Sequence, residues 1–456
     1  MNTLNKRFFF YLPPLLLVVF GLVESGALSG LMGLDRPQAI AFGVLVIAAV
    51  LWVTEWIPLY LTSFVILAAQ LAWLLPAIKT TVTSADQAKY LSPFFSEVIL
   101  LFLGGFVLAE VLGKYSLDRK LAGELLKRTG TNPAKAMAGL MFGSAFLSTW
   151  MSNTATTAMM FAIVLPIVEK IPKENPFSKA LLISIPFACN LGGIGSPIGT
   201  PPNAIAIGSL SQKGEVVSFG SWMLATIPFM LVLLVLTWVL LLKLFPPKDL
   251  VLELPKLDHK PLTKTQWGVF ALFGVTVTLW FLSDMLGLSI GLISLIPLLV
   301  AYGSGMLKLN DFNQLPWDVL FMVGGGMCLG VGLSQSGLTS YVVSLIPTDA
   351  PFLVILFAFG ILAALMTTFM SNTATANLLI PLAVSLNTGV GILVLVIALN
   401  CSTSMSLPIS TPPNAIAFGS GRLEVKDMAK AGVGISVVAL VLIVLVGMFY
   451  WPLLNI

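Results

Sequence analysis

The chain has 456 residues, of which 57% are apolar and 10% are charged, and its formal net charge is +4. Soluble domains carry about 25% charged residues, so the composition excludes an ordinary soluble protein and predicts an all-α polytopic membrane protein. The alternating segments of about ten residues that a membrane β-barrel needs do not occur, and we find no nucleic-acid-binding signal in the charge.

Apolar stretches follow one another from the N-terminus onward. A helix that crosses a bilayer needs roughly 20 mostly apolar residues, and some of the stretches reach that length only with their flanks. The basic start at Lys6 and Arg7 resembles a signal peptide, but no suitable cleavage site follows, so we predict a retained first helix. The first predicted spans lie near residues 9–30, 38–57, 59–76 and 96–128.

Two interrupted segments come next. The first is hairpin-like and has the string Ser-Asn-Thr (SNT) at its middle, and the second is broken at Ser196–Asn203 by a Thr-Pro-Pro-Asn (TPPN) string. A charged stretch, in which we interpret the single histidine His259 as a solvated loop residue, then links two halves of the chain. These predicted segments are the hairpin at 134–170, the broken segment at 178–212, a span at 219–245 and the link at 246–264.

The second half repeats the order of the first. Pro197–Ser209 reads PIGTPPNAIAIGS and Pro408–Ser420 reads PISTPPNAIAFGS, and the string SNTAT occurs at Ser152–Thr156 and at Ser371–Thr375. The SNT strings are 219 residues apart and the TPPN strings 211, and this nearly constant offset indicates a duplication. The predicted segments are spans near 265–285, 288–304 and 318–347, a hairpin at 350–388, a broken span at 389–421 and a last span at 428–453.

The positions of lysine and arginine predict the orientation. With a cytoplasmic N-terminus, eleven full spans and each SNT hairpin entering and leaving on one side, 20 of the 24 basic residues fall inside. Only Arg36, Lys79, Lys89 and Lys213 fall outside, as the positive-inside rule favours. The same threading brings the two hairpins in from opposite sides, so we predict an inverted repeat.

The two polar strings lie in sequence that should be surrounded by lipid or protein. Non-helical backbone persists at membrane depth only inside protein or beside a cavity, because unpaired polar groups are costly in lipid. A lone polar residue usually only holds helices together, and a lone proline usually only kinks one, but both strings occur twice and in the same order. Carbonyl and hydroxyl oxygens would coordinate a small hard cation such as Na⁺, and N–H groups at a helix start favour an anion.

The TPPN string should interrupt a helix. Two prolines remove two N–H donors and disfavour helical geometry just before them, so carbonyl groups near Gly199 and Ser410 should lack helical partners. Side chains that can accept or donate hydrogen bonds should then cap the helix that resumes. The expected capping residues are Thr200, Asn203, Thr411 and Asn414.

Charged residues are absent from the stretches that contain the strings. No Asp, Glu, Lys, Arg or His occurs at 140–168, 180–212 or 350–421. A proton-coupled carrier generally needs an ionisable group in its path, and a carrier that fixes an anion with arginine would show one. An anion bound here would therefore be balanced by helix dipoles and by mobile cations, which favours co-binding of Na⁺.

Other candidate features rank lower. Glu110 lies in an apolar stretch and is a functional candidate by default, but the matching residue at an offset of 221 is Val331. The glycine pairs Gly104-Gly105 and Gly325-Gly326 predict close helix packing. The three cysteines sit singly in apolar segments, which argues against a disulfide framework or a metal site.

The paired SNT strings, each followed by TPPN, resemble those of the divalent anion/sodium symporter (DASS) family with its INDY-type carriers. The resemblance covers about residues 8–451. It implies an inverted-repeat, elevator-type transporter with about eleven transmembrane helices and two re-entrant hairpins, homodimeric and located in the cytoplasmic membrane. The implied parts are N-terminal scaffold helices at 1–133, a first transport-domain half at 134–217, mostly scaffold spans and the charged link at 218–349, and a second transport-domain half at 350–456.

The resemblance also implies a function and its residues. The implied activity is sodium-coupled transport of a C4-dicarboxylate such as succinate, malate or fumarate, without enzymatic chemistry. Substrate-binding residues would be Asn153, Thr154, Thr200, Pro201, Asn372, Thr373, Thr411 and Pro412. One sodium site would use Ser148, Ser152, Asn153 and Gly199, and the other Thr367, Ser371, Asn372 and Ser410.

Several alternatives stay open at this point. Within transporters they are a Na⁺-independent dicarboxylate exchanger and a sodium-coupled sulfate or citrate carrier, although the uncharged strings favour a symporter. An ion channel would be expected to line its pore with a ring from several subunits, whereas one chain here carries both motif pairs. An intramembrane enzyme would need a nucleophile–base pair or a metal cluster, and Ser152 and Ser371 have no ionisable partner in their segments.

Overall fold

A computed structural model describes residues 3–172, 174–248, 250–253, 261–345, 351–386 and 389–454. The described residues form helices, turns and loops without strands, which confirms the predicted all-α fold. The helices of the first half are α1 (Thr3–Glu24), α2 (Ala27–Met32), α3 (Arg36–Thr54), α4 (Leu59–Ala69), α5 (Leu75–Ile78), α6 (Ser84–Leu91), α7 (Glu97–Lys114), α8 (Leu117–Thr129), α9 (Pro133–Ser148), α10 (Asn153–Glu169), α11 (Phe177–Gly193), α12 (Pro201–Gln212) and α13 (Phe219–Leu244).

The second half continues with the same alternation of long and short helices. Among the described residues, eight helical stretches are long and apolar enough to cross a membrane. The helices after the charged link are α14 (Lys264–Leu286), α15 (Ile290–Gly303), α16 (Leu309–Asn313), α17 (Trp317–Gln335), α18 (Leu338–Ser344), α19 (Phe352–Phe369), α20 (Asn372–Val384), α21 (Val390–Thr403), α22 (Pro412–Phe418) and α23 (Val425–Phe449).

Left-handed residues divide some spans that the sequence predicted as continuous. Gly26 takes a φ of 75° between α1 and α2, and Gly337 a φ of 76° between α17 and α18. Glycine adopts this conformation without steric cost, and a right-handed helix cannot continue through it. The short helix α6 was not predicted.

The SNT segments form hairpins of two short helices. In the first hairpin α9 has 16 residues and α10 has 17, so each is about 25 Å long at about 1.5 Å per residue. In the second, α19 has 18 residues and α20 has 13. The helices α9, α10 and α20 are shorter than the roughly 30 Å of bilayer hydrocarbon, as a re-entrant hairpin requires, whereas α19 is one of the eight stretches long enough to cross a membrane.

The broken segments are interrupted before their prolines. The first break was predicted at Ser196–Asn203, but α11 ends at Gly193 and α12 already begins at Pro201. Prolines are tolerated in the first turn of a helix because the N–H groups there lack helical partners. The prolines therefore start the new helix, and the unwound segment lies upstream of them.

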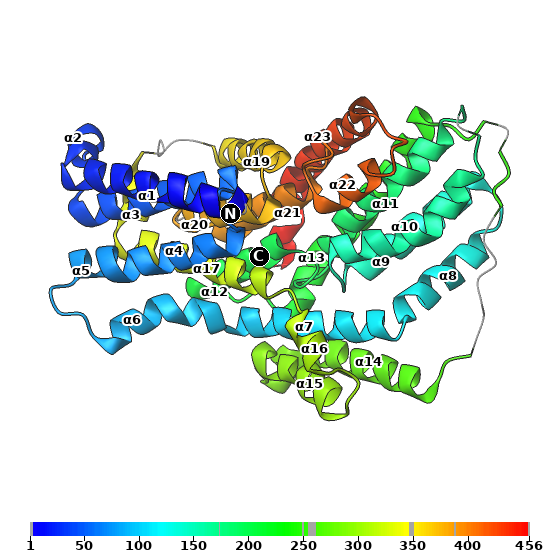
Figure 1. The fold of residues 1–456 in the computed structure, drawn as a ribbon, viewed down its shortest axis with the longest axis horizontal. Coiled ribbons are helices and arrows are strands. Elements are labelled where there is room, and N and C mark those ends of the chain that lie inside the picture. The colour runs from blue at the N-terminus through cyan, green and yellow to red at the C-terminus, as the bar shows by residue number, and fades with distance from the viewer. Residues whose placement is uncertain are drawn as a thin grey trace.

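The two halves of the molecule interlock. The helix after each break packs against the other half: α12 contacts α20 and α21, and α22 contacts α10 and α11. Figure 1 shows α19 to α22 between the α1–α5 end of the molecule and the α8–α11 end. The helix α13 belongs to the segment predicted as mostly scaffold, yet it packs against α9, α11 and α23, which groups it with the hairpins.

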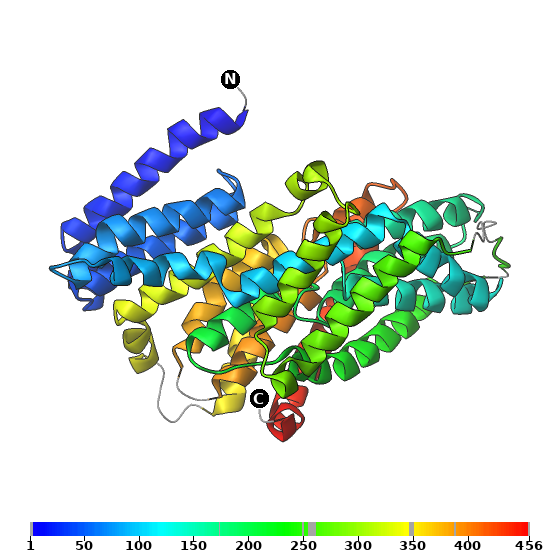
Figure 2. The ribbon, with the colours of Figure 1, turned by 90° about the horizontal axis from the view of Figure 1, so that it is seen from below.

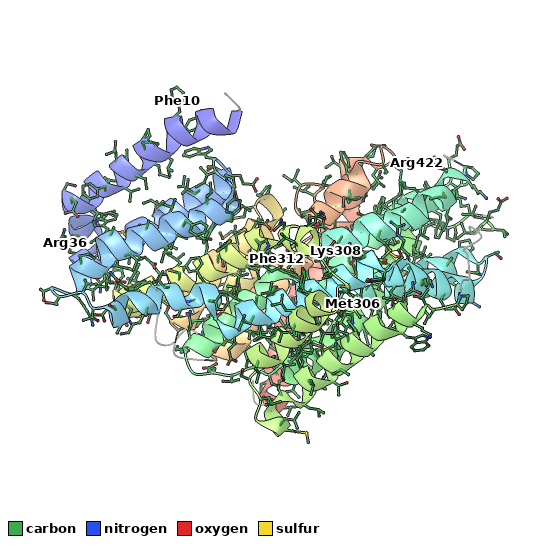
Figure 3. All side chains as sticks on the ribbon, turned by 60° about the horizontal axis from the view of Figure 1, so that its bottom comes forward. Phe10, Arg36, Met306, Lys308, Phe312 and Arg422 are labelled. Atoms are coloured by element: carbon green, nitrogen blue, oxygen red, sulfur yellow. The ribbon has the colours of Figure 1, made fainter. Side chains whose placement is uncertain are left out.

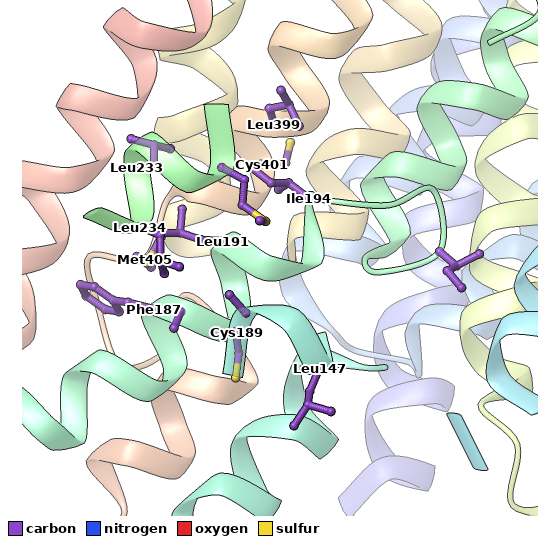
Figure 4. Close-up of a cluster of buried hydrophobic side chains, with 14 of the residues drawn as sticks. Leu147, Phe187, Cys189, Leu191, Ile194, Leu233, Leu234, Leu399, Cys401 and Met405 are labelled. Atoms are coloured by element: carbon purple, nitrogen blue, oxygen red, sulfur yellow. The ribbon is translucent and has the colours of Figure 1, made fainter. Parts of the chain in front are cut away.

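The helices α11 and α21 form the centre of this arrangement. Nearly every residue of both helices is buried, and a helix that is apolar all round belongs in a core. Figure 4 shows Cys189 and Leu191 of α11 in the same cluster as Leu399 and Cys401 of α21. The unwound segments therefore continue from fixed helix ends.

The glycine pair of α7 packs against two different neighbours. A Cβ atom at Gly104 would lie 2.6 Å from the carbonyl oxygen of Ser294 in α15. A Cβ atom at Gly105 would lie 2.8 Å from Cδ1 of Ile198, in the unwound segment before α12. Both separations are too short for a side chain, so α7 is closely packed on both sides.

The second glycine pair repeats this geometry on α17. Added side chains would overlap Ser63 of α4 at Gly325 and Asn377 of α20 at Gly326. The predicted close packing at both glycine pairs is confirmed. Each of these helices thus lies between an element of the predicted scaffold and an element of the predicted transport domain.

We expect Gly326→Ala to destabilise the protein by about 1–3 kcal/mol, the usual cost of overpacking. The new methyl group would overlap Asn377, which is fully buried. Thermal unfolding in detergent measures the effect. Gly330→Ala is the matched control, because its Cβ would lie 3.6 Å from Pro381 of the same α20. Equal stability of both variants would contradict the packing argument.

The helices α1 to α3 lie at one end of the molecule. In Figure 3 Arg36 lies at this end, well away from Lys308 and Arg422, which the threading places on the opposite side of the membrane. Figure 2 shows the start of α1 projecting away from the other helices. His259, which the sequence predicts to be a solvated loop residue, lies outside the described residues.

Candidate binding site

Both SNT strings and both TPPN strings line one cavity of about 820 Å³. The SNT strings reach it from the starts of α10 and α20, and the TPPN strings from the starts of α12 and α22. The predicted substrate-binding residues that line the cavity are Asn153, Thr154, Thr200, Pro201, Asn372, Thr373, Thr411 and Pro412. Of the other predicted sodium ligands, Ser152, Gly199, Ser371 and Ser410 also line it.

The opposite wall of the cavity comes from helices outside the hairpins. The end of α3 contributes Thr54 and Glu55, and α7 contributes Phe102 and Phe106. Val319 at the start of α17 also belongs to this wall. The cavity therefore lies between the duplicated strings and the predicted scaffold.

Four helix N-termini meet at the cavity. The helices α10 and α20 start at Asn153 and Asn372, and α12 and α22 start at Pro201 and Pro412. A helix N-terminus carries a partial positive charge, and its first N–H groups lack helical partners. No Lys, Arg or His occurs among the described residues that line the cavity. An anion in this cavity would therefore be attracted only by helix ends and neutral polar groups.

A cluster of oxygen atoms lies directly behind the first SNT string. The fully buried Ser148 Oγ lies 2.7 Å from Asn153 Oδ1 and 2.8 Å from the carbonyl oxygen of Cys189. A hydroxyl group has only one proton to donate, so three close oxygens share a single hydrogen. This excess of lone pairs suits a hard cation, which takes oxygen ligands.

The second half contains the same cluster. Thr367 Oγ1 lies 2.6 Å from Asn372 Oδ1 and 3.1 Å from the carbonyl oxygen of Cys401. Thr367 is also fully buried. Neither Ser148 nor Thr367 lines the cavity, so both predicted ligands stand behind the asparagines.

The TPPN asparagines hold the unwound segments in shape. The side-chain nitrogen of Asn203 donates hydrogen bonds to the carbonyl oxygens of Gly193 and Ser196, at 3.0 and 2.7 Å. A Cβ atom at Gly199 would overlap the carbonyl group of Gly193, so this segment folds tightly on itself. The side chain of Asn203 thus donates hydrogen bonds to carbonyl groups that the interruption of the helix leaves without helical partners.

Of the four predicted capping residues, only Thr411 caps its helix with its side chain. Thr411 accepts a hydrogen bond from the backbone N–H of Asn414 at 3.2 Å, which is an N-cap. Thr200 makes no such bond, although it occupies the corresponding position. The side chain of Asn414 behaves like that of Asn203 and donates to carbonyl groups of its own unwound segment, those of Met405 and Leu407.

Glu55 and Asn190 are among the cavity residues that were not predicted from the sequence. Glu55 ends α3 with a φ of 49°, a left-handed conformation that is unusual for a residue with a side chain. Asn190 is 1% exposed in α11 and also lines the cavity. In the sequence, Glu55 was visible only as a carboxylate at the end of an apolar run, and Asn190 only as a single amide in an otherwise apolar segment. Glu110, the low-ranked candidate, is not among the cavity residues.

Comparisons with known proteins place the chain among transporters. Residues 49–402 match the sequence profile of CitMHS, the citrate transporter family. The chain is 31% identical over 459 residues to the sodium-dependent dicarboxylate transporter SdcS of Staphylococcus saprophyticus, covering 90% of this chain and 86% of that one. It is 30% identical over 434 residues to the uncharacterized transporter C3B8.04c of Schizosaccharomyces pombe, covering 91% of this chain but only about half (50%) of that relative's length.

A solved structure is similar in fold. The YdaH transporter of Alcanivorax borkumensis aligns with a TM-score of 0.57 and 14% sequence identity, covering 87% of this chain and 98% of that one. At this identity the likeness shows the fold alone. It supports the all-helical fold.

Proposed function

The chain belongs to the CitMHS family of citrate transporters, of the divalent anion/sodium symporter type, and on this premise we propose that it is a sodium-coupled C4-dicarboxylate carrier. Its substrates would be succinate, malate or fumarate. Its relatives are transporters, so the chain is a multi-pass membrane transporter and not an enzyme. The observation that carries the proposal is the convergence of all four duplicated strings on one cavity.

The electrostatics of the cavity support an anion as substrate. Four helix N-termini provide partial positive charge, and the backbone N–H groups at the starts of α10 and α20 can donate to carboxylates. The hydroxyl groups of Thr154, Thr373 and Thr411 add donors. Because dipoles alone offset a dianion only in part, mobile cations beside it would supply the remaining charge.

The oxygen clusters supply two places for these cations. Asn153 Oδ1 and Asn372 Oδ1 each belong to a cluster, and both side chains also line the cavity. A Na⁺ ion at either cluster would stand next to the substrate anion. Binding of cation and anion would then be reciprocal, because each raises the affinity for the other.

The residues that line the cavity also support an alternating-access movement of the hairpins against the scaffold. The cavity is bounded by the hairpins on one side and by α3, α7 and α17 on the other. If the N-terminus is cytoplasmic, the ends of α3 and α17 that line the cavity lie on the cytoplasmic side. Alternating access would move the hairpins and broken helices as a unit against the scaffold, within a homodimer in the cytoplasmic membrane.

We expect uptake of labelled succinate into proteoliposomes to rise steeply with an inward Na⁺ gradient. The reason is that the cavity has no fixed cation, so the anion depends on mobile ones. K⁺ or choline at equal ionic strength should give little uptake. Equal uptake without Na⁺ would overturn symport and favour the exchanger, provided that internal succinate then stimulates it.

Citrate is the second candidate substrate. The family is described as citrate transporters, and a cavity of about 820 Å³ leaves space for a third carboxylate. Competition of unlabelled citrate and sulfate against labelled succinate, in the same proteoliposomes, ranks these alternatives.

A further inference from the structure

Asn190 breaks the symmetry between the halves. The carbonyl groups of Cys189 and Cys401 accept hydrogen bonds from matched hydroxyl groups, so the ends of α11 and α21 correspond position by position. The residue that corresponds to Asn190 is then Ser402, whose hydroxyl donates to the carbonyl oxygen of Ala398 in its own helix, at 3.2 Å. Asn190 lines the cavity and Ser402 does not.

The side chain of Asn190 reaches across to the other half. Its nitrogen Nδ2 lies 3.2 Å from Thr411 Oγ1 and 3.5 Å from Asn414 Oδ1. The orientation of the amide is fixed by Asn414, whose own nitrogen donates to two carbonyl groups and whose oxygen therefore faces Asn190. An amide oxygen can only accept, so Asn190 must present its nitrogen there.

This arrangement also determines the role of Thr411. Its hydroxyl oxygen already accepts from the N–H of Asn414 and from the amide of Asn190. A hydroxyl oxygen has two lone pairs and one proton. Because both lone pairs are engaged, the hydroxyl group of Thr411 can only donate its proton. Thr411 lines the cavity, so a substrate bound there can accept that proton in a hydrogen bond.

The oxygen of Asn190 remains available as an acceptor. Within the described part of the chain no donor reaches Asn190 Oδ1, although the residue is 1% exposed and lines the cavity. A fully ionised, unsubstituted dicarboxylate has acceptors only, so it cannot satisfy this oxygen. Because this oxygen is not fully buried, water in the cavity can donate to it when no substrate is bound. A substrate that displaces the water leaves the acceptor without a donor, which costs free energy, and a hydroxyl group on the substrate would remove that cost.

We propose that Asn190 makes the site selective for a 2-hydroxy-dicarboxylate over its unsubstituted analogue. Thr411 donates to one carboxylate, and Asn190 Oδ1, on the side chain bonded to Thr411, accepts from the hydroxyl on the neighbouring carbon. Asn190 is a specificity-determining residue, and the inference rests on the proposed dicarboxylate transport. It adds to that proposal the chemical class of the preferred substrate.

The test compares half-saturating concentrations of malate and succinate for Na⁺-driven uptake into proteoliposomes. Wild-type protein should favour malate about five- to tenfold, the factor expected from one neutral hydrogen bond. Asn190→Ala should bring the malate-to-succinate ratio close to one. Ser402→Ala, at the corresponding position of the other half, should keep the wild-type ratio.

The outcomes separate the inference from the function on which it rests. No preference for malate in the wild type would overturn the inference without any variant having to fold. A preference that survives in Asn190→Ala, or an equal loss of both substrates there, would overturn it as well, since a merely structural role lowers both. Absence of uptake of either anion by the wild type would instead overturn the proposed dicarboxylate transport.

Discussion

Asn153→Ala and Asn372→Ala should each lower succinate transport at least about 100-fold while the protein still folds. Each amide oxygen lies in an oxygen cluster, and each side chain also lines the cavity. Hydrogen bonds to charged partners contribute about 1.5–3 kcal/mol each. A residue that serves both cation and anion would thus account for about 3 kcal/mol or more, and each 1.4 kcal/mol is tenfold.

Uptake into proteoliposomes, normalised to incorporated protein, measures this loss. Size-exclusion profiles and thermal unfolding establish that the variants fold. Asn313→Ala, at the exposed end of α16, is the control for an asparagine outside the cavity. Normal transport by both cavity variants would mean that the SNT strings serve only to pack the hairpins.

Removing the hydroxyl group that lies behind either cavity asparagine should chiefly lower the affinity for Na⁺. Ser148→Ala and Thr367→Ala should each raise the Na⁺ concentration for half-maximal uptake about tenfold or more, because each cluster loses one of three oxygens. Neither residue lines the cavity, so the apparent affinity for succinate at saturating Na⁺ should change little. Uptake measured as a function of Na⁺ at fixed succinate checks this.

The two halves offer a matched control for this experiment. The first cluster uses serine and the second uses threonine at the corresponding position. Thr367→Ser keeps the hydroxyl and should keep the Na⁺ dependence, whereas Thr367→Ala should not. If alanine and serine gave the same Na⁺ dependence, the hydroxyl would not be a cation ligand.

Much of the architecture could be predicted because the duplication leaves repeated strings in the sequence. The SNT strings predicted the hairpin tips, and the glycine pairs predicted the close packing of α7 and α17. The TPPN strings predicted the breaks but placed the first one too far downstream. Prolines were interpreted as helix breakers there, whereas at Pro201 and Pro412 they begin helices.

The contacts between the halves could not be predicted in this way. Asn190 matters through Thr411 and Asn414, which are more than 200 residues away, and no local pattern links them. The grouping of α13 with α11 and α23 likewise depends on tertiary packing. Glu55 could not be predicted as a cavity residue, because its position at the end of an apolar run does not indicate whether the residue borders a cavity.

We propose that both halves together bind one anion, and equilibrium binding tests this shared site most directly. Labelled succinate, titrated onto purified protein in saturating Na⁺, should bind once per chain. Both Asn153→Ala and Asn372→Ala should abolish that binding, since each half contributes to the same cavity. Two succinate molecules per chain, with one lost in each variant, would contradict the shared site and indicate two independent ones.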